Sequence, residues 1–135
     1  VDVSGSGYIA IQSDGDIPSA GASGITVLLG GGGDGDGIST RNAGNIDAYG
    51  DGIRARVYGD GDITIYNNEG STITTGSDYS GIDARVVGDG DIRIGNEIDN
   101  TITSGGDGIY RVSRAKCRSA GSRMRYKARN PPPRE

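Results

Sequence analysis

The chain contains no histidine, tryptophan or phenylalanine, and only one cysteine (Cys117), among its 135 residues. Without histidine, the chain cannot supply a Ser-His-Asp triad, a histidine general base or an imidazole metal ligand. A single cysteine excludes an intramolecular disulfide and a cysteine-rich zinc site. No apolar run approaches the roughly 20 residues of a membrane-spanning helix, so we expect no membrane span in this segment.

Glycine and β-branched residues are abundant instead. The 26 glycines make up nearly a fifth of the chain, against a usual share of about 7%. The large aliphatic residues are 16 isoleucines, 7 valines and only 2 leucines. β-Branched side chains are stiff at χ1 and favour strands over helices. The composition therefore predicts an all-β protein with many tight turns.

The charge divides the chain into two parts. Residues 1–112 carry 17 acidic and 6 basic side chains, a net charge of −11, whereas residues 113–135 carry 8 basic and 1 acidic, a net charge of +7. The second part ends with three prolines at 131–133 before Arg134. We therefore expect a folded region at 1–112 and a basic, proline-ending, disordered tail at 113–135.

A repeat runs through the first region. GIRARVYGDGDITI at residues 52–65 returns as GIDARVVGDGDIRI at 81–94, a shift of 29 residues, and TITTG at 72–76 returns as TITSG at 101–105. Residues 3–11 fit the same pattern when Val3 is aligned with Val57. Four units are expected, and a fifth begins near Gly108. The units lie near 3–26, 27–56, 57–85 and 86–112.

Each unit predicts three short strands joined by tight corners. Apolar residues alternate with polar ones, as in Ile63-Thr64-Ile65, and this period indicates a strand with one buried face. One unit cannot bury that face alone, but stacked identical units can. The sequence therefore predicts a right-handed parallel β-helix of about four turns. The alternative is an antiparallel hairpin array, because Asp-Gly turns between strands are also a hairpin signal.

The repeat resembles the passenger regions of large bacterial autotransporters, over residues 1–112 and most strongly over 52–109. This resemblance implies a fragment of a passenger, displayed at the bacterial cell surface or outside the cell and anchored in the outer membrane by the full-length protein. It implies a non-enzymatic structural or adhesion module, with glycans or proteins of host or neighbouring cells as partners. It leaves the oligomeric state open.

Two other interpretations stay open. The chain could be a fragment of a β-helical polysaccharide-acting enzyme, although a catalytic carboxylate pair should be singular and these aspartates recur with the repeat. It could also be a truncated gene product without function, because the abrupt change after Val112 would fit a frameshift. On the leading interpretation we expect no catalytic residues.

The Gly-Asp corners suggest one candidate site. Asp60 and Asp62 should lie next to Asp89 and Asp91, with Asp34 and Asp36 of the preceding unit below them. Oxygen-rich loops of this kind bind Ca²⁺ in some proteins. A candidate weak calcium site is therefore formed by Asp60, Asp62, Asp89 and Asp91. The alternative is that they are solvated turn residues, in which case the protein needs no cofactor.

Three further patterns predict no ligand. The glycine run at 30–35 fits G-x-G-x-x-G, but no helical pattern follows it, so we expect a loop. Thr72 and Thr74 should stack on Thr101 and Thr103, and two rungs are too few for an ice-binding surface. The basic tail has little aromatic content, so we expect no nucleic-acid partner, and a dimer through Cys117 would be artefactual.

Overall fold

The computed structural model describes residues 1–19, 21–31, 35–97 and 100–113. Within these ranges the secondary structure is entirely strand and turn, and all ten strand pairings are parallel. The described residues contain no helix long and apolar enough to cross a membrane. The expected disordered tail lies outside the described residues, except for Ser113.

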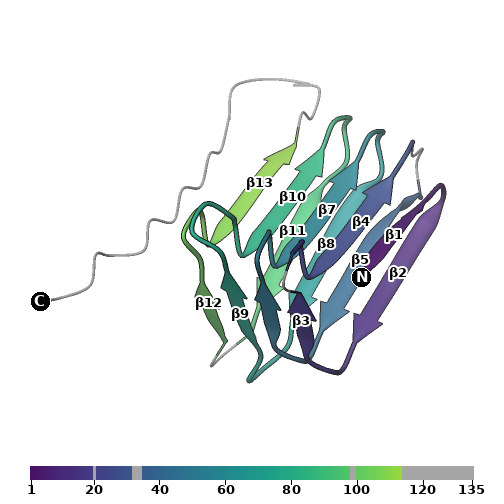
Figure 1. Ribbon diagram of the computed structural model, residues 1–135. Coiled ribbons are helices and arrows are strands. Elements are labelled where there is room, and N and C mark those ends of the chain that lie inside the picture. Colours follow the sequence, from purple (N-terminus) through teal and green to yellow (C-terminus); the bar gives the residue numbers. More distant parts are fainter. Residues whose placement is uncertain (20, 32–34, 98–99, 114–135) are drawn as a thin grey trace, which may run out of the picture.

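In the described residues, thirteen strands form three parallel sheets (Figure 1). Sheet A contains β1 (Asp2–Gly5), β4 (Ile25–Leu29), β7 (Ile53–Val57), β10 (Ile82–Val86) and β13 (Ile109–Ser113). Sheet B contains β2 (Tyr8–Ser13), β5 (Gly37–Asn42), β8 (Asp62–Asn67) and β11 (Ile92–Asn96). Sheet C contains β3 (Ile17–Ser19), β6 (Ile46–Ala48), β9 (Thr72–Thr75) and β12 (Thr101–Thr103).

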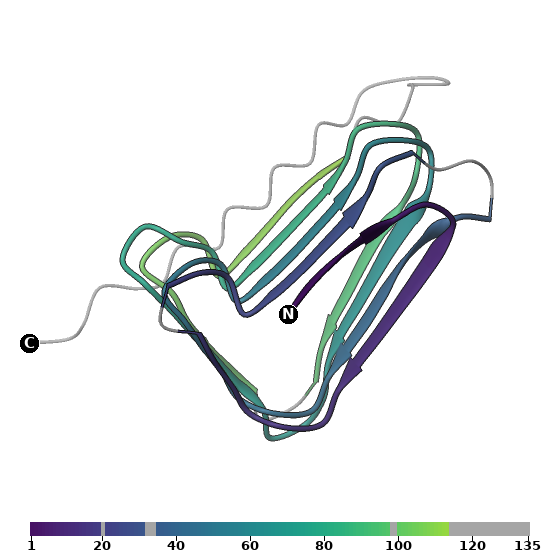
Figure 2. The same cartoon turned by 45° about the vertical axis from the view of Figure 1, so that its right-hand side comes forward.

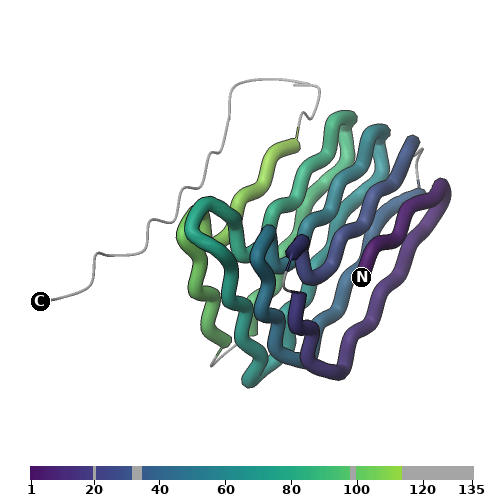
Figure 3. The backbone as a smooth tube through the Cα atoms, in the orientation of Figure 1, coloured from purple at the N-terminus to yellow at the C-terminus, as the bar shows by residue number. Residues whose placement is uncertain are grey.

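The chain visits the sheets in the order A, B, C and then begins the next turn, so it winds as a parallel β-helix (Figure 3). Four turns are complete, and β13 begins a fifth. The 29-residue repeat sets the register: Ile53 pairs with Ile82, and Ile63 pairs with Ile92. The predicted β-helix is confirmed.

The hairpin alternative is wrong for the described residues. β7 and β8, which flank the Gly-Asp segment, belong to different sheets, and each pairs with strands of the neighbouring turns. The segment therefore turns a corner between two sheets. Both strands bury alternate side chains in the same interior. If β7 and β8 paired with each other as an antiparallel hairpin, they would not enclose that interior.

The proposed alignment of Val3 with Val57 is also wrong. Val3 pairs with Val27, which in turn pairs with Ala55, whereas Val57 pairs with Leu29. The reason is the length of the corner. Only residues 6–7 join β1 to β2, whereas residues 58–61 join β7 to β8. The short first corner shifts the apparent repeat by two residues.

The interior is built from columns of isoleucine, one on each sheet. In sheet B, for example, Ile38 lies between Ile9 and Ile63 on the neighbouring turns. Seen close to the helix axis, sheets A and B form two long sides and sheet C a shorter third side (Figure 2). The fully or almost fully buried apolar side chains all point into this space: Ile25, Val27, Leu29, Ile38, Ile46, Ala48, Ile53, Ala55, Val57, Ile63, Ile65, Ile73, Ile82, Ala84 and Val86.

Glycine is required where the chain passes from sheet C to sheet A. A Cβ atom on Gly52 would collide with the Ile73 side chain and the Gly81 carbonyl oxygen, and one on Gly81 would collide with Ile102 and the Gly108 carbonyl. These glycines directly precede β7 and β10. Their carbonyls accept the first inter-turn hydrogen bonds of sheet A, such as that from Ile53 N to Gly81 O at 2.9 Å.

Candidate functional site

The aspartates of the Gly-Asp corners lie in register, as predicted, and their side chains bond to the backbone of the next turn. Asp60 Oδ1 accepts a hydrogen bond from Asp89 N at 2.9 Å, and Asp62 Oδ1 accepts one from Asp91 N at 2.8 Å. At a corner these amides leave the regular ladder, and an amide without an acceptor is costly when water is excluded. The carboxylates therefore help to hold one turn on the next.

The predicted extension of this ladder to the preceding unit is wrong for Asp36. The register partner of Asp62 is Gly37, and it is the backbone carbonyl of Asp36 that accepts the Asp62 amide, at 3.2 Å. The corner between β4 and β5 spans residues 30–36 and is longer than the corner at 58–61. Because of this difference in length, the Gly-Asp pattern of the longer corner is shifted by one residue, so that Gly37 and not Asp36 is aligned with Asp62. Asp34 lies outside the described residues.

The geometry gives the calcium hypothesis no support. Within the described ranges, no three acidic or thiol side chains converge closely enough to hold a metal ion. Calcium takes six to eight oxygen ligands, and here Asp60 and Asp62 each direct one oxygen at a backbone amide. The four-aspartate site stays a prediction, and the observed contacts favour its alternative, turn chemistry.

The same kind of bond recurs at the other two corners. Asp16 Oδ1 accepts from Asn45 N at 2.9 Å, and Asn45 Oδ1 accepts from Thr72 N at 3.0 Å, so the bonds continue over three turns. At the corner between sheets C and A, Asp51 Oδ1 accepts from Ser80 N at 2.9 Å. The recurring Asp and Asn residues thus link successive turns all around the solenoid.

An asparagine column, which the sequence analysis did not single out, lies at the end of sheet B. Asn42 Nδ2 donates to Asn67 Oδ1 at 2.9 Å, and Asn67 Nδ2 donates to Asn96 Oδ1 at 3.0 Å. Asn42 and Asn67 are fully buried. The signal was present, because Asn67 and Asn96 are 29 residues apart like the rest of the repeat. The column is structural, since its amide groups bond mainly to one another.

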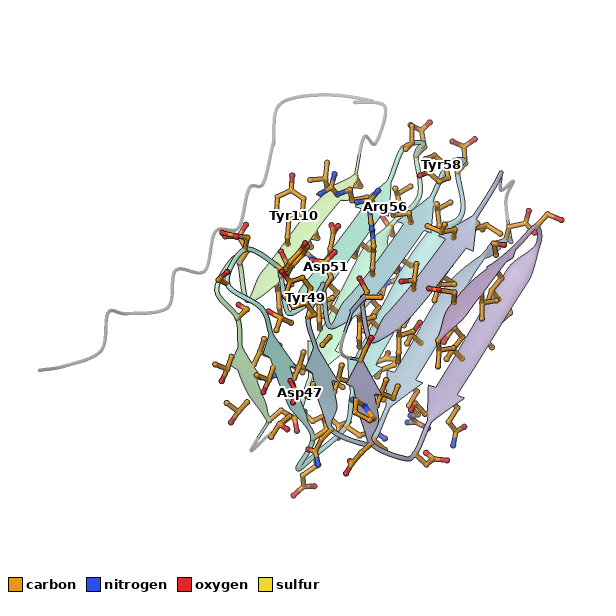
Figure 4. The ribbon with its side chains drawn as sticks, viewed as in Figure 1. Asp47, Tyr49, Asp51, Arg56, Tyr58 and Tyr110 are labelled. Atoms are coloured by element: carbon orange, nitrogen blue, oxygen red, sulfur yellow. The ribbon has the colours of Figure 1, made fainter. Side chains whose placement is uncertain are left out.

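Charged side chains gather on the outer face of sheet A (Figure 4). The register places Arg54, Asp83 and Tyr110 in one row across β7, β10 and β13, and Arg56 next to Arg85 in a second row. These positions alternate with the buried ones. The neighbouring strand β4 presents uncharged residues at the equivalent positions. The cationic side chains of this face are therefore on the third and fourth turns, and Asp2 on the first turn holds the same row as Arg54.

Asp83 is the centre of this cluster, and it is buried although it lies on the outer face. Its two oxygens accept from two arginines: Oδ2 from Arg56 Nη2 at 3.2 Å and Oδ1 from Arg85 Nε at 2.9 Å. The hydrogen bond that Arg85 donates to Asp83 raises the pKa of the Arg85 guanidinium above its ordinary value, against the opposing effect of burial. The Arg85 guanidinium also lies 4.9 Å from the centre of the Tyr110 ring, within cation–π distance.

Two tyrosines stand at the corner beside this face. Tyr49 and Tyr79 are both exposed, and their ring centres are 5.9 Å apart with the planes tilted by 51°. They precede β7 and β10 by a few residues, and the corner that carries them projects beside the outer face of sheet A in Figure 2. Asp51 lies at this same corner, near Tyr49 in Figure 4, and its charge also acts on Arg85.

The predicted threonine rows on sheet C are confirmed. Thr72 pairs with Thr101 and Thr74 with Thr103, and all four side chains are exposed. Asp47 takes the position next to Thr74 on the preceding turn, so the row of threonines ends there. A shallow depression between these strands and the C-to-A corner is lined by Pro18, Ser19, Asp47, Ala48, Tyr49, Thr75 and Gly76.

The arginine and tyrosine residues of sheet A and its corner form the most chemically distinctive surface in the described part of the chain. We call Arg54, Arg56, Asp83, Arg85 and Tyr110 the sheet A cluster. The resemblance to autotransporter passengers stays a prediction that rests on the repeat. Comparisons of the chain with protein-family models, with curated proteins and with solved structures found no significant match.

Proposed function

We propose that this chain is a non-enzymatic structural and adhesion module, in which the β-helix is the rigid support and the sheet A cluster with Tyr49 and Tyr79 is the contact surface. One observation carries the proposal: Arg54, Arg56 and Arg85 lie in adjacent register positions on sheet A, and the paired rings of Tyr49 and Tyr79 stand at the corner beside them. Tyrosine and arginine dominate the energetics of many protein interfaces. Tyrosine has an apolar ring and a polar hydroxyl, so it suits a surface that is wet when free and covered when bound.

The repeat supports placing the module in a longer surface or secreted protein. In a solenoid each turn contacts only its neighbours, so turns can be added without a new core. The hydrogen bonds accepted by the side chains of Asp60 and Asp62 show such nearest-neighbour contacts, because each bond joins one turn only to the next. A passenger of a bacterial autotransporter is the class of protein that the repeat resembles. Display at the bacterial surface, with cell-surface glycans or proteins as partners, follows from that resemblance.

The test of adhesion uses the full chain immobilised on beads and measures binding to cells and to a panel of cell-surface glycans. We expect binding that falls at least about tenfold in the double variant Tyr49→Ser, Tyr79→Ser, because loss of a central aromatic contact commonly costs 2 kcal/mol or more. The matched control is Tyr8→Ser, Tyr66→Ser, which removes two exposed tyrosines from sheet B. Equal loss in both double variants, or no binding, would contradict the proposal.

The same panel separates adhesion from polysaccharide cleavage. Each bound glycan is recovered after long incubation, and its chain length is measured. We expect unchanged chain lengths, since the corner carboxylates are engaged with backbone amides. Shortened chains would favour the polysaccharide-acting alternative. An unfolded or aggregated chain by circular dichroism would favour the truncated gene product.

Location needs a separate experiment in intact cells of the source organism. An antibody raised against the full chain should label the cells without permeabilisation, and added protease should remove the labelling. Labelling that requires permeabilisation would contradict display at the surface, while leaving the binding results untouched.

A further inference from the structure

We infer that the sheet A cluster binds carboxylate-bearing polysaccharide, such as a chain of uronic acid residues. This inference rests on the proposed adhesion function and names the ligand class for its surface. The contact would pair the guanidinium groups of Arg54, Arg56 and Arg85 with ligand carboxylates, and the rings of Tyr49 and Tyr79 with the apolar faces of the sugars.

The sheet A cluster is cationic on an acidic protein. Residues 1–112 carry a net charge of −11, yet three of their six arginines lie together on the outer face of sheet A. Arg56 and Arg85 are direct neighbours in register, which is unfavourable for like charges. Asp83 and the nearby Asp51 offset part of this charge, and three cations stand against these two anions. A local cationic surface attracts anionic ligands, even on a protein whose net charge is negative.

The guanidinium groups of the cluster have hydrogen-bond donors that Asp83 does not use. A guanidinium has five N–H donors, and Arg56 and Arg85 are each seen to use a single nitrogen on Asp83. The Nε–H groups of Arg54 and Arg56 are buried and have no acceptor, so they lie out of reach of a ligand. The side chains of Arg56 and Arg85 are 22% and 45% exposed, and a planar guanidinium matches a carboxylate with two parallel bonds. A carboxylate is therefore the anion that best fits the guanidinium donors that remain accessible.

The spacing of the turns suits a polymeric ligand. Successive turns of a β-helix rise by about 4.8 Å, and Arg56 and Arg85 occupy successive turns. A polymer with a carboxylate on each unit could therefore contact both of these turns at once. An extended acidic peptide usually binds a sheet by adding a strand at its edge. The sheet A cluster lies on a face instead, beside the paired rings of Tyr49 and Tyr79.

The test measures binding of the full chain to tetragalacturonate by calorimetry, with the fully methyl-esterified tetramer and a tetraglutamate peptide as comparison ligands. Arg54→Gln is the informative variant, because it removes one cation without breaking either ion pair of Asp83. The matched control is Arg41→Gln on the outer face of sheet B, with the same change of charge. Circular dichroism of each variant checks that the β-helix is retained.

We expect the acidic tetramer to bind, and the esterified tetramer to bind at least about tenfold more weakly, because one charge-assisted hydrogen bond is worth about a factor of ten. Arg54→Gln should weaken binding by a similar factor, and Arg41→Gln by less than about twofold. In the double variant Arg56→Lys, Arg85→Lys, the charge stays but the planar donors are lost, so binding should again fall.

Three outcomes would overturn the inference: equal affinity for the esterified tetramer, no effect of Arg54→Gln, or equally tight binding of tetraglutamate. If the esterified tetramer binds equally and Tyr49→Ser, Tyr79→Ser abolishes that binding, the adhesion function stands and only the acidic ligand is wrong. If no ligand or cell surface binds at all, both fall. The two proposals are thus tested separately.

Discussion

Arg56 donates a hydrogen bond from Nη2 to Asp83 Oδ2 at 3.2 Å, across two neighbouring turns and 27 residues of sequence. Asp83 also accepts from Arg85, which stands next to Arg56 in register. One carboxylate therefore binds two guanidinium groups that would otherwise repel each other. Its side chain is 4% exposed, whereas those of Arg56 and Arg85 are 22% and 45% exposed.

Replacing Asp83 by alanine should lower the free energy of unfolding by about 1–3 kcal/mol, because two charge-assisted hydrogen bonds are lost and two adjacent cations lose their counter-ion. The loss stays below that of a fully buried ion pair because the arginines reach solvent. Urea denaturation measures it. Asp91→Ala is the control, since its ion pair with Arg93 is 3.5 Å long and more than half exposed on both sides. A similar cost for both variants would contradict the assigned role of Asp83.

Replacing Asn67 by alanine should cost more than replacing Asn96. Asn67 is fully buried and donates to Asn96 while accepting from Asn42 and from Ser71 Oγ. Its loss leaves several buried groups without partners, at about 1–3 kcal/mol for each. Asn96 is exposed and ends the column. The midpoints of urea denaturation should fall in the order wild type, Asn96→Ala, Asn67→Ala, and the reverse order of the two variants would refute this account.

Gly52→Ala should destabilise the protein by about 1–3 kcal/mol, although alanine is normally tolerated better than glycine in regular structure. The added methyl group would meet the Ile73 side chain and the Gly81 carbonyl, and neither can move without disturbing a neighbouring turn. At Gly15 a Cβ atom would meet nothing within 4 Å. Thermal melts should show a lower midpoint for Gly52→Ala and little change for Gly15→Ala.

Millimolar calcium should leave the thermal midpoint of the wild-type chain unchanged, because the geometry offers no cluster of three ligands within the described residues. Asp62→Ala should lower the midpoint slightly in the presence or absence of calcium, since it removes the acceptor for the Asp91 amide. Asp62→Asn keeps an acceptor oxygen and should change the thermal midpoint less than Asp62→Ala does. A calcium-induced rise that disappears in Asp60→Asn, Asp62→Asn would instead establish the metal site.

Much of the fold could be predicted because the repeat carries the register directly. An exact shift of 29 residues places Ile53 on Ile82 and Ile63 on Ile92, and the structure has both pairs. Prediction failed where corners differ in length. The alignments of Val3 and of Asp36 were each wrong because glycine-rich linkers change length without any change in the strands that they join.

The candidate site could be predicted only in part. The strand register places Asp83 beside Arg54, yet the Asp83 carboxylate forms its ion pairs with Arg56 and Arg85. That choice depends on side-chain rotamers and not on the repeat. The recurring residues predict the fold, whereas the sheet A cluster arises where the repeat changes, from Arg54 to Asp83. In a repetitive chain, the residues that depart from the repeat therefore distinguish the surface of one turn from that of the next.

The register of the solenoid also bears on how fast the chain folds. Paired residues are separated by 24 positions for Asp2 and Thr26, and by 29 for Ile53 and Ile82. A chain with such separations loses the conformational entropy of closing a long loop before the contacts between its first two turns can form. All-β proteins with such non-local contacts fold on the order of milliseconds to seconds. Once two turns have met, each further turn docks on a finished template. The formation of that first contact therefore sets the time that the whole β-helix needs to form.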